Sequence, residues 1–299
     1  MIKRAKGRVS APSSRADVGS NSRVAAFEEE RAFAFLEINQ RQEKPRTAGL
    51  TEIRGPYYTP MGQRYLHDVL ETMGRYVDSL KFAGGSFVLM PLKQLQALVE
   101  TAHRFNVLVS TGGFIERVLA RGAKQVERYV AKCAELGFDI VEISSGFITI
   151  PTQDWIRLIK KVQRAGLKAK PEVGIQFGAG GASQSSVLEQ QGVSSAQLAI
   201  ERAKQFLDAG ASLIMVESEG ITESVATWRV DVPEQFASAL GLERVMFEAA
   251  EPPVFGWYIK QFGPEVNLFV DHSQIVQLEA LRRGIWGTDD LWGRVVTFK

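Results

Sequence analysis

The amino-acid sequence predicts an α/β protein that folds as a closed (β/α)8 barrel, the TIM barrel. Two observations carry this prediction: short apolar runs recur along the chain, and segments with helical periodicity separate them. The repeat occurs eight times within about 250 residues, which is a typical size for such a barrel. An open doubly wound sheet is the alternative, but the count of eight and the even spacing favour the barrel.

The predicted strands are rich in residues that favour extended structure. They comprise residues 49–55, 78–84, 107–113, 139–145, 167–173, 211–218, 244–250 and 266–272. Helical spacing of apolar residues is clear in 62–77 (Leu66, Val69, Leu70, Met73, Val77) and in 114–136 (Val118, Val126, Val130, Cys133). Most helices should end at a glycine, because glycine adopts the left-handed conformation that often ends helices. These glycines are Gly137, Gly166, Gly210, Gly241 and Gly263.

The first 24 residues differ from the rest of the chain. They hold six Lys or Arg residues against one Asp, and they show no apolar periodicity. This composition predicts a disordered basic tail at 1–24, followed by an N-terminal extension at 25–48 and the barrel at 49–299. We expect a cytoplasmic protein. The alternative is a mitochondrial presequence, which is also rich in Arg and Ser and poor in acidic residues.

Bulk composition argues against several classes of partner. Lys and Arg exceed Asp and Glu by only two (36 against 34), so we expect neither a nucleic-acid nor a membrane partner. No apolar run reaches the roughly 18 residues that a membrane span requires. With a single cysteine, Cys133, the chain cannot form an internal disulfide.

Carboxylates recur where the predicted strands end. Glu142, Glu172, Glu217 and Glu248 end the fourth to seventh strands, at the face where such barrels build active sites. Glu52 and Arg54 lie near the end of the first strand, and Lys81 lies on the second. The alternative is that each glutamate pairs with a lysine or arginine and only ties layers of the barrel together.

The predicted charges at this face do not balance. Four glutamates face Lys81, Lys170 and Arg54, and buried charges without partners are costly. Mg²⁺ prefers oxygen ligands and would relieve the excess negative charge, whereas the three scattered histidines do not suit zinc.

Two further motifs have less specific interpretations. The sequence GAGGASQSS (178–186) is typical of a mobile loop that closes over a substrate or contacts a phosphate, but it lacks the GK[ST] ending of a P-loop. The sequence LRRG (281–284) resembles a phosphate clamp but is predicted on the closed face. There its arginines should meet the helix dipole and nearby carboxylates.

Eight stretches together resemble the phosphosulfolactate synthase family over roughly residues 47 to 295. They are LKFAGGS, STGGFIE, LGFDIVEIS, PEVG, DAGASLIMVES, VMFEA, FGPEVNL and LEALRRG. The resemblance implies a Mg²⁺-dependent homo-oligomer, with a trimer suspected, that binds a small anionic substrate and adds sulfite to phosphoenolpyruvate. The stretch TEIRGPYYT is similar to a eukaryotic branch that includes plant heat-stress-associated proteins. A non-catalytic protein that keeps the barrel is therefore the alternative function.

The resemblance suggests roles for individual residues. Lys81 and Arg54 are predicted to neutralise enolate charge during catalysis, and Glu172 is predicted to act with them or to help hold the metal. The predicted metal ligands are Glu142, Glu217 and Glu248. The predicted substrate-binding residues are Ser110, Gly112, Gly113, Ser144 and Asn267.

Several positions depart from the family pattern, and most of the departures remove positive charge. Ile175 and Gln176 stand where the family carries lysines, and Glu219 stands where it has an arginine. Glu251-Pro252 replaces a lysine, and EIRGPYY replaces an Asp-Lys pair at the first strand. Because cations stabilise a developing enolate, we predict weak or absent synthase activity. Alternation along the fifth strand places Lys170 one layer below Glu172, and we predict that these two residues pair.

Overall fold

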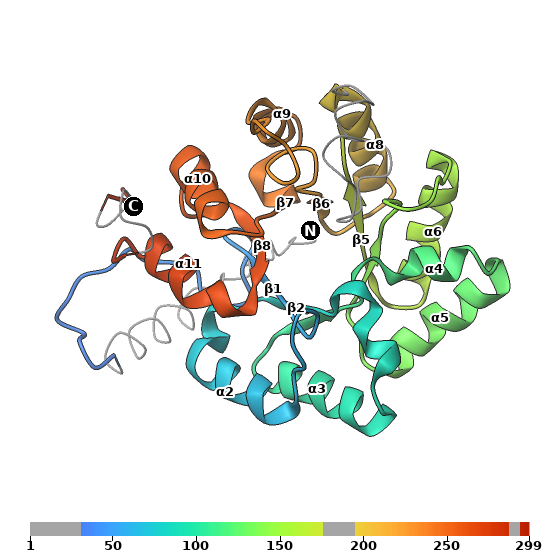
Figure 1. The fold of residues 1–299 in the computed structure, drawn as a ribbon, viewed down its shortest axis with the longest axis horizontal. Helices are drawn as coiled ribbons and strands as arrows, with labels where there is room; N and C mark the ends of the chain where they lie inside the picture. The colour runs from blue at the N-terminus through green and yellow to red at the C-terminus, as the bar shows by residue number, and fades with distance from the viewer. Residues whose placement is uncertain (1–30, 176–194, 287–293, 299) are drawn as a thin grey trace, which may run out of the picture. The chain divides into compact units, whose positions relative to one another are not determined.

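The computed structural model describes residues 31–175, 195–286 and 294–298 and confirms the predicted TIM barrel (Figure 1). Eight parallel strands follow one another in chain order, and β8 pairs with β1 to close the sheet. The strands are β1 (Thr51–Arg54), β2 (Ser79–Lys81), β3 (Leu108–Ser110), β4 (Ile140–Ile143), β5 (Lys168–Val173), β6 (Ile214–Val216), β7 (Val245–Glu248) and β8 (Asn267–Asp271). Each lies inside its predicted range.

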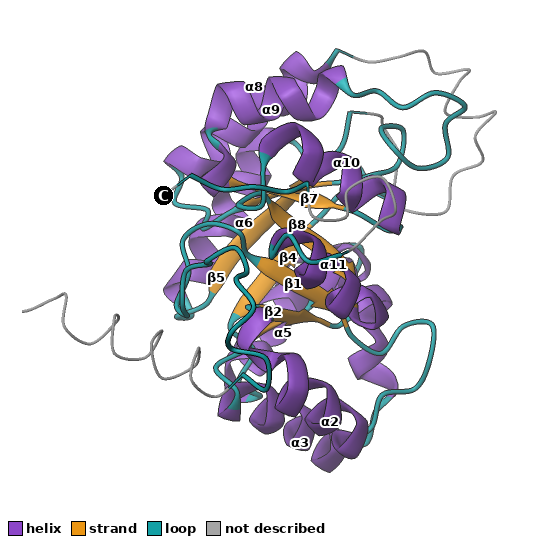
Figure 2. Ribbon diagram, turned by 90° about the vertical axis from the view of Figure 1, so that its left-hand side faces the viewer, coloured by secondary structure: helices purple, strands orange, loops and turns teal. Residues whose placement is uncertain are grey.

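Helices surround the strands on the outside of the barrel (Figure 2). The α-helices are α2 (Gln63–Met73), α3 (Leu92–Arg104), α4 (Ile115–Leu119), α5 (Ala123–Glu135), α6 (Thr152–Arg164), α8 (Ala196–Asp208), α9 (Asp231–Leu240), α10 (Pro252–Phe262) and α11 (Ile275–Arg282). Short 3₁₀ turns are η1 (Gly74–Tyr76), η2 (Ala83–Leu89), η3 (Gly112–Phe114), η4 (Leu242–Arg244) and η5 (His272–Gln274). The predicted helical stretch 114–136 is interrupted at Gly122, whose φ of +91° is not helical.

The local signals read from the sequence explain how the helices are placed. All five predicted glycine stop signals adopt positive φ, between +80° and +97°. The predicted apolar faces are buried, as Leu66 and Leu70 show for α2 and Val126 and Val130 for α5. Burial of these faces against the sheet is the main force that holds each helix to the barrel.

The chain divides into two compact units, residues 1–38 and 39–299. Within the first unit, the described residues 31–38 form a turn in which the rings of Phe33 and Phe35 meet edge to face. The second unit contains the whole barrel and begins ten residues before the predicted start at Gly49. Residues 39–48 therefore belong with the barrel.

Residues 39–48 run along the closed end of the barrel, where the strands begin. The Lys44 ammonium group donates to the carbonyl oxygens of Gly74 (2.9 Å) and Phe105 (3.0 Å), which cap α2 and α3. Arg46 donates to Asp78 (2.9 Å) just before β2, and Arg41 forms an ion pair with Glu279 in α11. Cations suit these positions because the carbonyl groups at helix C-termini carry partial negative charge.

The LRRG arginines also lie at the closed end, as predicted. Arg283 pairs with Glu279 at 2.9 Å. Arg282 is fully buried and donates instead to three backbone carbonyls, those of Gly49 (2.8 Å), Pro264 (2.9 Å) and Val266 (2.9 Å). Both arginines therefore hold the fold together.

The described residues do not test every sequence-based expectation. The tail at 1–24 and the Gly/Ser loop at 178–186 lie outside them. Within the described ranges, no helix combines the length and the apolar character that crossing a membrane requires.

Candidate active site

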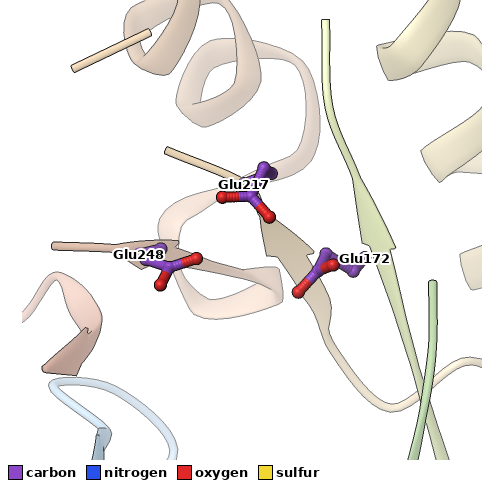
Figure 3. A group of neighbouring side chains, drawn as sticks. All are labelled: Glu172, Glu217 and Glu248. Atoms are coloured by element: carbon purple, nitrogen blue, oxygen red, sulfur yellow. The ribbon is translucent and has the colours of Figure 1, made fainter. Parts of the chain in front are cut away.

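Three glutamates meet where neighbouring strands end (Figure 3). Glu172 lies on β5, Glu217 directly follows β6, and Glu248 is the last residue of β7. Their carboxylate groups turn toward a common centre, and one oxygen from each lies within 4.8 Å of the others. This convergence is what parallel strands of a barrel produce when each carries an inward-facing side chain at its C-terminal end.

The glutamates face a cavity of about 350 Å³ at the mouth of the barrel. This mouth cavity brings together most of the residues that the sequence suggested for the site. Its lining includes Arg54, Lys81, Gly112, Gly113, Glu142, Ser144, Glu172, Glu217 and Glu248. Ser110 ends β3 beside Lys81 but is not part of the lining.

A chain of buried ion pairs forms the floor of the site. Lys81 contacts Glu142 at 2.8 Å and Glu172 at 3.6 Å. One layer deeper, Lys170 contacts Glu142 at 3.1 Å and also pairs with Glu52. Glu52, Lys81, Glu142 and Lys170 are buried and Glu172 is partly buried, so each charge depends on the next for compensation.

The predicted pairing of Lys170 with Glu172 is wrong. Lys170 lies in register with Glu142 on the neighbouring strand β4. It also reaches Glu52 on β1, which lies in the same deep layer of the barrel interior. Glu172 is two residues further toward the mouth and turns to Lys81 and the other carboxylates.

The carboxylates of the site fall into two electrostatic classes. Burial alone would raise the pKa of Glu142, but Lys81 and Lys170 hold this pKa below its usual value, so Glu142 is ionised. Burial, with repulsion from Glu142, raises the pKa of Glu172 to about 8. Burial, with repulsion from Glu248 and Glu172, raises the pKa of Glu217 well above its usual value. Glu172 and Glu217 therefore favour the protonated form at neutral pH, because the fold does not compensate the charge that ionisation would place there.

Lys81 and Arg54 bring positive charge to the opposite side of the cluster. Burial opposes the ammonium form of Lys81, but Glu142 and Glu172 outweigh it and raise the pKa of Lys81. Its nitrogen lies 4.0 Å from the centre of the Phe269 ring. Arg54 contacts Glu248 at 2.5 Å and donates to the Tyr58 hydroxyl at 2.9 Å. Both cations are thus fixed in place, and the raised pKa keeps Lys81 charged at neutral pH.

The three-glutamate cluster fits a Mg²⁺ ion. The ligands are carboxylate oxygens, and Mg²⁺ binds oxygen at about 2.0–2.1 Å, so opposite ligands of one ion lie roughly 4 Å apart. Small side-chain adjustments bring oxygens within 4.8 Å to that spacing. The predicted ligand set was Glu142, Glu217 and Glu248, whereas the geometry favours Glu172 in place of Glu142, which the two lysines already neutralise.

Comparison with known proteins identifies the family of this barrel. The family model described as (2R)-phospho-3-sulfolactate synthase (ComA) matches residues 39–288. The chain belongs to the phosphosulfolactate synthase family. It is 37% identical over 266 residues to Protein HEAT-STRESS-ASSOCIATED 32 of Arabidopsis thaliana, and the match covers 86% of this chain and 93% of the plant protein. It is 30% identical over 271 residues to the phosphosulfolactate synthase of Methanothermobacter thermautotrophicus, covering 88% and 98% of the two chains.

Solved structures of other proteins share the fold. The carboxyl transferase domain from Rhizobium etli pyruvate carboxylase matches with a TM-score of 0.53 and 11% sequence identity, over 76% of this chain. This chain spans 40% of that solved chain. At such low identity the likeness shows the barrel architecture alone.

One residue that matches the phosphosulfolactate synthase pattern lies away from the site. Asn267 was predicted to bind substrate, but it is the first residue of β8 and lies at the closed end. Its amide nitrogen donates to the carbonyls of Leu242 (2.9 Å) and Val245 (3.0 Å), and its oxygen accepts from Leu50 (2.8 Å). Its hydrogen-bonding groups join the starts of three strands, so its role is structural.

The two glycines of the STGG motif allow close approach of backbone segments. Gly112 has a φ of +60°, and a Cβ there would lie 2.8 Å from the carbonyl oxygen of Phe82. A Cβ on Gly113 would lie 2.5 Å from the hydroxyl of Ser144. Side chains at these positions would push the loops after β2, β3 and β4 apart and would distort the mouth cavity.

Glu116 is a site residue that sequence reasoning missed. Its carboxylate accepts hydrogen bonds from the Ser144 hydroxyl (2.6 Å) and from the backbone N–H groups of Gly146 (3.0 Å) and Phe147 (2.7 Å). It thereby fixes the loop after β4 against the glycine turn after β3. The available signal was an acidic residue in the first turn of a helix directly after the GGF motif.

The departures from the family pattern also have positions in the structure. Ile175 is buried near Glu172, and Gln176 lies outside the described residues. Glu219 is buried but does not line the mouth cavity. Glu251 is exposed, at the residue before α10.

Proposed function

We propose that this protein is a Mg²⁺-dependent, lyase-type enzyme that acts at the barrel mouth on a small phosphorylated carboxylate. The observation that carries the proposal is the convergence of Glu172, Glu217 and Glu248 on one centre. The raised pKa values of Glu172 and Glu217 support it, because they mark carboxyl groups whose ionised forms the fold leaves uncompensated and a bound cation would stabilise. A protein that used these glutamates only as structural ties would be expected to pair each with a cation.

The family relationship supports a specific reaction, the addition of sulfite to phosphoenolpyruvate. The sulfur lone pair would form a bond to the terminal carbon, and electrons of the double bond would move toward the carboxylate. A proton would then be added at the central carbon. Charge therefore develops on the carboxylate, and the site must stabilise it there.

The chain's own residues have distinct tasks in this proposal. Glu172, Glu217 and Glu248 would hold Mg²⁺, which when bound polarises the substrate carboxylate as a Lewis acid. Lys81 stays protonated, so it provides fixed positive charge and does not act as a base. Arg54 is oriented by Glu248 and Tyr58 toward the same cavity. Glu142 stays ionised and holds Lys81 at the floor.

A direct assay tests the proposed activity. The full chain is incubated with phosphoenolpyruvate, sulfite and Mg²⁺, and phosphosulfolactate is measured. We expect turnover well below the median enzyme value of about 10 per second, because the cations at the site are few. Mutation of Glu217 to Gln should abolish this turnover, whereas Glu251→Gln, at an exposed residue beyond the site, should leave it unchanged. Turnover without Mg²⁺, or equal turnover in Glu217→Gln, would contradict the proposal.

A non-catalytic role is the second candidate, and one observation favours it. Both lysines of the barrel interior are neutralised by buried carboxylates, Lys81 by Glu142 and Lys170 by Glu52 and Glu142. The positive charge of these two lysines is then not available to a multiply charged substrate. This candidate predicts that neither Mg²⁺ nor phosphoenolpyruvate binds when each is titrated into the full chain by calorimetry.

We also propose that the protein is cytoplasmic and, from the family resemblance, that it is a homo-oligomer. Light scattering coupled to size-exclusion chromatography would give its mass in solution, and a mass of one chain would contradict the proposal.

A further inference from the structure

Arg117 is a cation of the mouth cavity that has no task in the proposed function. It lies on α4, the helix that follows the STGGF turn after β3, and it is exposed. The cavity lining contains two other described cations, Arg54 and Lys81. These two pair with Glu248 and Glu142, whereas Arg117 forms no ion pair within the part of the chain that the structure describes. Its charge is therefore available to a ligand.

The nearby carboxylates of the lining have other partners. Glu116 precedes Arg117 in the sequence, but its carboxylate accepts hydrogen bonds from the loop after β4. Glu223 also lines the cavity, and it accepts a hydrogen bond from the Ser218 hydroxyl at 2.7 Å. Neither carboxylate forms an ion pair with Arg117 among the described contacts.

The barrel places Arg117 on the far side of the mouth cavity from the glutamate cluster. In a closed sheet of eight strands, β3 lies opposite β7, and the cluster occupies the ends of β5 to β7. The loops after β2 and β3 line the cavity with Gly84, Gly112 and Gly113, which have no side chains to fill this side. Arg117 also lines a groove between α3 and α5, so it lies at the rim of the mouth. A ligand held by the cluster can therefore extend across the cavity toward a positive charge that the described residues leave uncompensated.

The two sides of the cavity suit the two charged groups of a phosphorylated carboxylate. The volume of about 350 Å³ is at the lower end of the range for ligand pockets, so a small molecule is enough to span it. On one side, Mg²⁺ held by the cluster would attract the carboxylate. On the other side, a guanidinium group can bind phosphate oxygens through two parallel hydrogen bonds, and a phosphate group carries about two negative charges.

We propose that Arg117 binds the phosphate group of the substrate at the rim of the mouth cavity while the carboxylate lies at the glutamate cluster. The inference rests on the proposed function, because the metal site fixes the carboxylate end. Arg117 is then a specificity-determining residue, which selects phosphorylated carboxylates over unphosphorylated ones of the same size. Its charge partly replaces the cations that the family pattern has after the fifth and sixth strands, where this chain carries Ile175 and Glu219.

Calorimetry on the full chain with saturating Mg²⁺ tests this proposal with two probes, phosphoenolpyruvate and pyruvate, which lacks the phosphate. We expect the wild type to bind phosphoenolpyruvate roughly tenfold or more tightly than pyruvate. Mutation of Arg117 to Gln should weaken phosphoenolpyruvate binding by about tenfold or more and leave pyruvate binding unchanged, because it removes charge-assisted hydrogen bonds to the phosphate. Mutation of Arg117 to Lys should keep part of the affinity, since lysine retains the charge but not the planar fork.

Mutation of Arg121 to Gln is the matched control. Arg121 is exposed just beyond α4 and lines the groove between α3 and α5, but it is not part of the mouth cavity lining. This mutation removes the same charge from the same part of the surface and should leave the affinity for both probes unchanged. Circular dichroism checks that each variant folds.

Three results would overturn this inference and leave the proposed function standing. The first is phosphoenolpyruvate binding that Arg117→Gln does not weaken, and the second is an equal loss in Arg121→Gln. The third is a loss in Arg117→Gln that is as large for pyruvate as for phosphoenolpyruvate. Failure of the wild type to bind Mg²⁺ or phosphoenolpyruvate would overturn both the proposed function and this inference.

Discussion

The two ends of the barrel both bury charged side chains but compensate them differently. At the closed end, Arg282 donates to three backbone carbonyls and Arg46 pairs with Asp78. At the mouth, Glu172 and Glu217 face each other and Glu248, while Lys81 contacts Glu172 and Arg54 contacts Glu248. The closed end is thus arranged for stability, and the mouth keeps an electrostatic cost that a ligand can relieve.

The comparison teaches that burial alone does not distinguish a structural charge from a functional one. Arg282 is as buried as any residue of the site, and burial lowers its pKa well below the usual value. What separates it from Glu217 is the set of partners. Arg282 has acceptors from the starts of neighbouring strands. Glu217 accepts from the backbone N–H of Ser218 at 2.9 Å, but the charged groups that act on it most strongly are other carboxylates.

The largest expected effect is at the closed end. Mutation of Arg282 to Met should destabilise the protein by about 3 kcal/mol or more, because it removes three buried hydrogen bonds to carbonyl oxygens, of which the Gly49 carbonyl keeps a donor in Arg41. Chemical denaturation measures this loss. Mutation of Arg157 to Met is the control, because its pair with Asp154 is exposed and should contribute less than about 1 kcal/mol. Equal losses in the two variants would remove the distinction between the closed end and the surface.

Replacing a buried ionisable side chain at the mouth with a neutral one should stabilise the protein instead of destabilising it. Mutation of Glu217 to Gln keeps the size of the side chain and removes a carboxyl group whose pKa is raised in the folded state. Without Mg²⁺ at pH 8, the free energy of unfolding should rise, because the wild-type carboxylate must take up a proton on folding and glutamine does not. With Mg²⁺, the wild type should gain stability that the variant does not. A loss of stability in the metal-free variant would show that Glu217 is a structural tie.

The pH dependence of stability should separate the two ends further. Glu172 has a pKa raised to about 8 by burial and by Glu142, so the folded state holds a proton that the unfolded state has released. In the presence of EDTA, this contribution is complete below about pH 4.5 and is lost as pH rises toward 8. Mutation of Glu172 to Gln should flatten the profile in that window.

At the closed end, Lys44 should affect stability in a higher pH range, and there stability should rise with pH. Burial lowers the pKa of Lys44 to about 8 from 10.5, so its contribution is complete above 10.5 and is lost as pH falls to 8. In EDTA, the free energy of unfolding of the wild type should therefore fall between pH 5 and 8, because of Glu172. Mutation of Lys44 to Met should change the slope of this free energy against pH only above pH 8. A slope that differs from that of the wild type below pH 7 would contradict this assignment.

Sequence periodicity was sufficient to predict the fold and to predict which end of the barrel holds the site. Strand periodicity with a glutamate at the last position placed Glu172, Glu217 and Glu248 at the mouth before any contact was known. Partner choice was not predictable in the same way. Lys170 pairs with Glu52, 118 residues away, because the closed barrel brings β1 and β5 into one interior layer. Alternation along a single strand does not contain that information.

Position along a strand explains why Asn267 was wrongly assigned to the site and why Glu116 was missed. Asn267 was grouped with the site because it matches a family residue, but the first residue of a strand lies at the closed end of the barrel. Glu116 was missed for the reverse reason, because it lies in a helix and reaches the loop after β4 only through tertiary packing. Strand-based reasoning finds residues at strand ends and overlooks those that position the loops.

The smallest expected effect on stability is that of deleting the N-terminal residues. This deletion tests at which residue the folded unit begins. The compact unit that contains the barrel starts at Asn39, whose backbone N–H donates to the Arg283 carbonyl at 2.9 Å. Deletion of residues 1–24, which carry no apolar periodicity, should leave the melting temperature within about 2 °C of the full chain. Deletion of residues 1–48 is the contrasting variant, because it removes Arg41, Lys44 and Arg46 and with them their hydrogen bonds to Glu279, Gly74 and Asp78. We expect it to lower the melting temperature by several times that amount. A large loss in the shorter deletion would place stabilising contacts within residues 1–24 and would move the boundary of the folded unit toward the N-terminus.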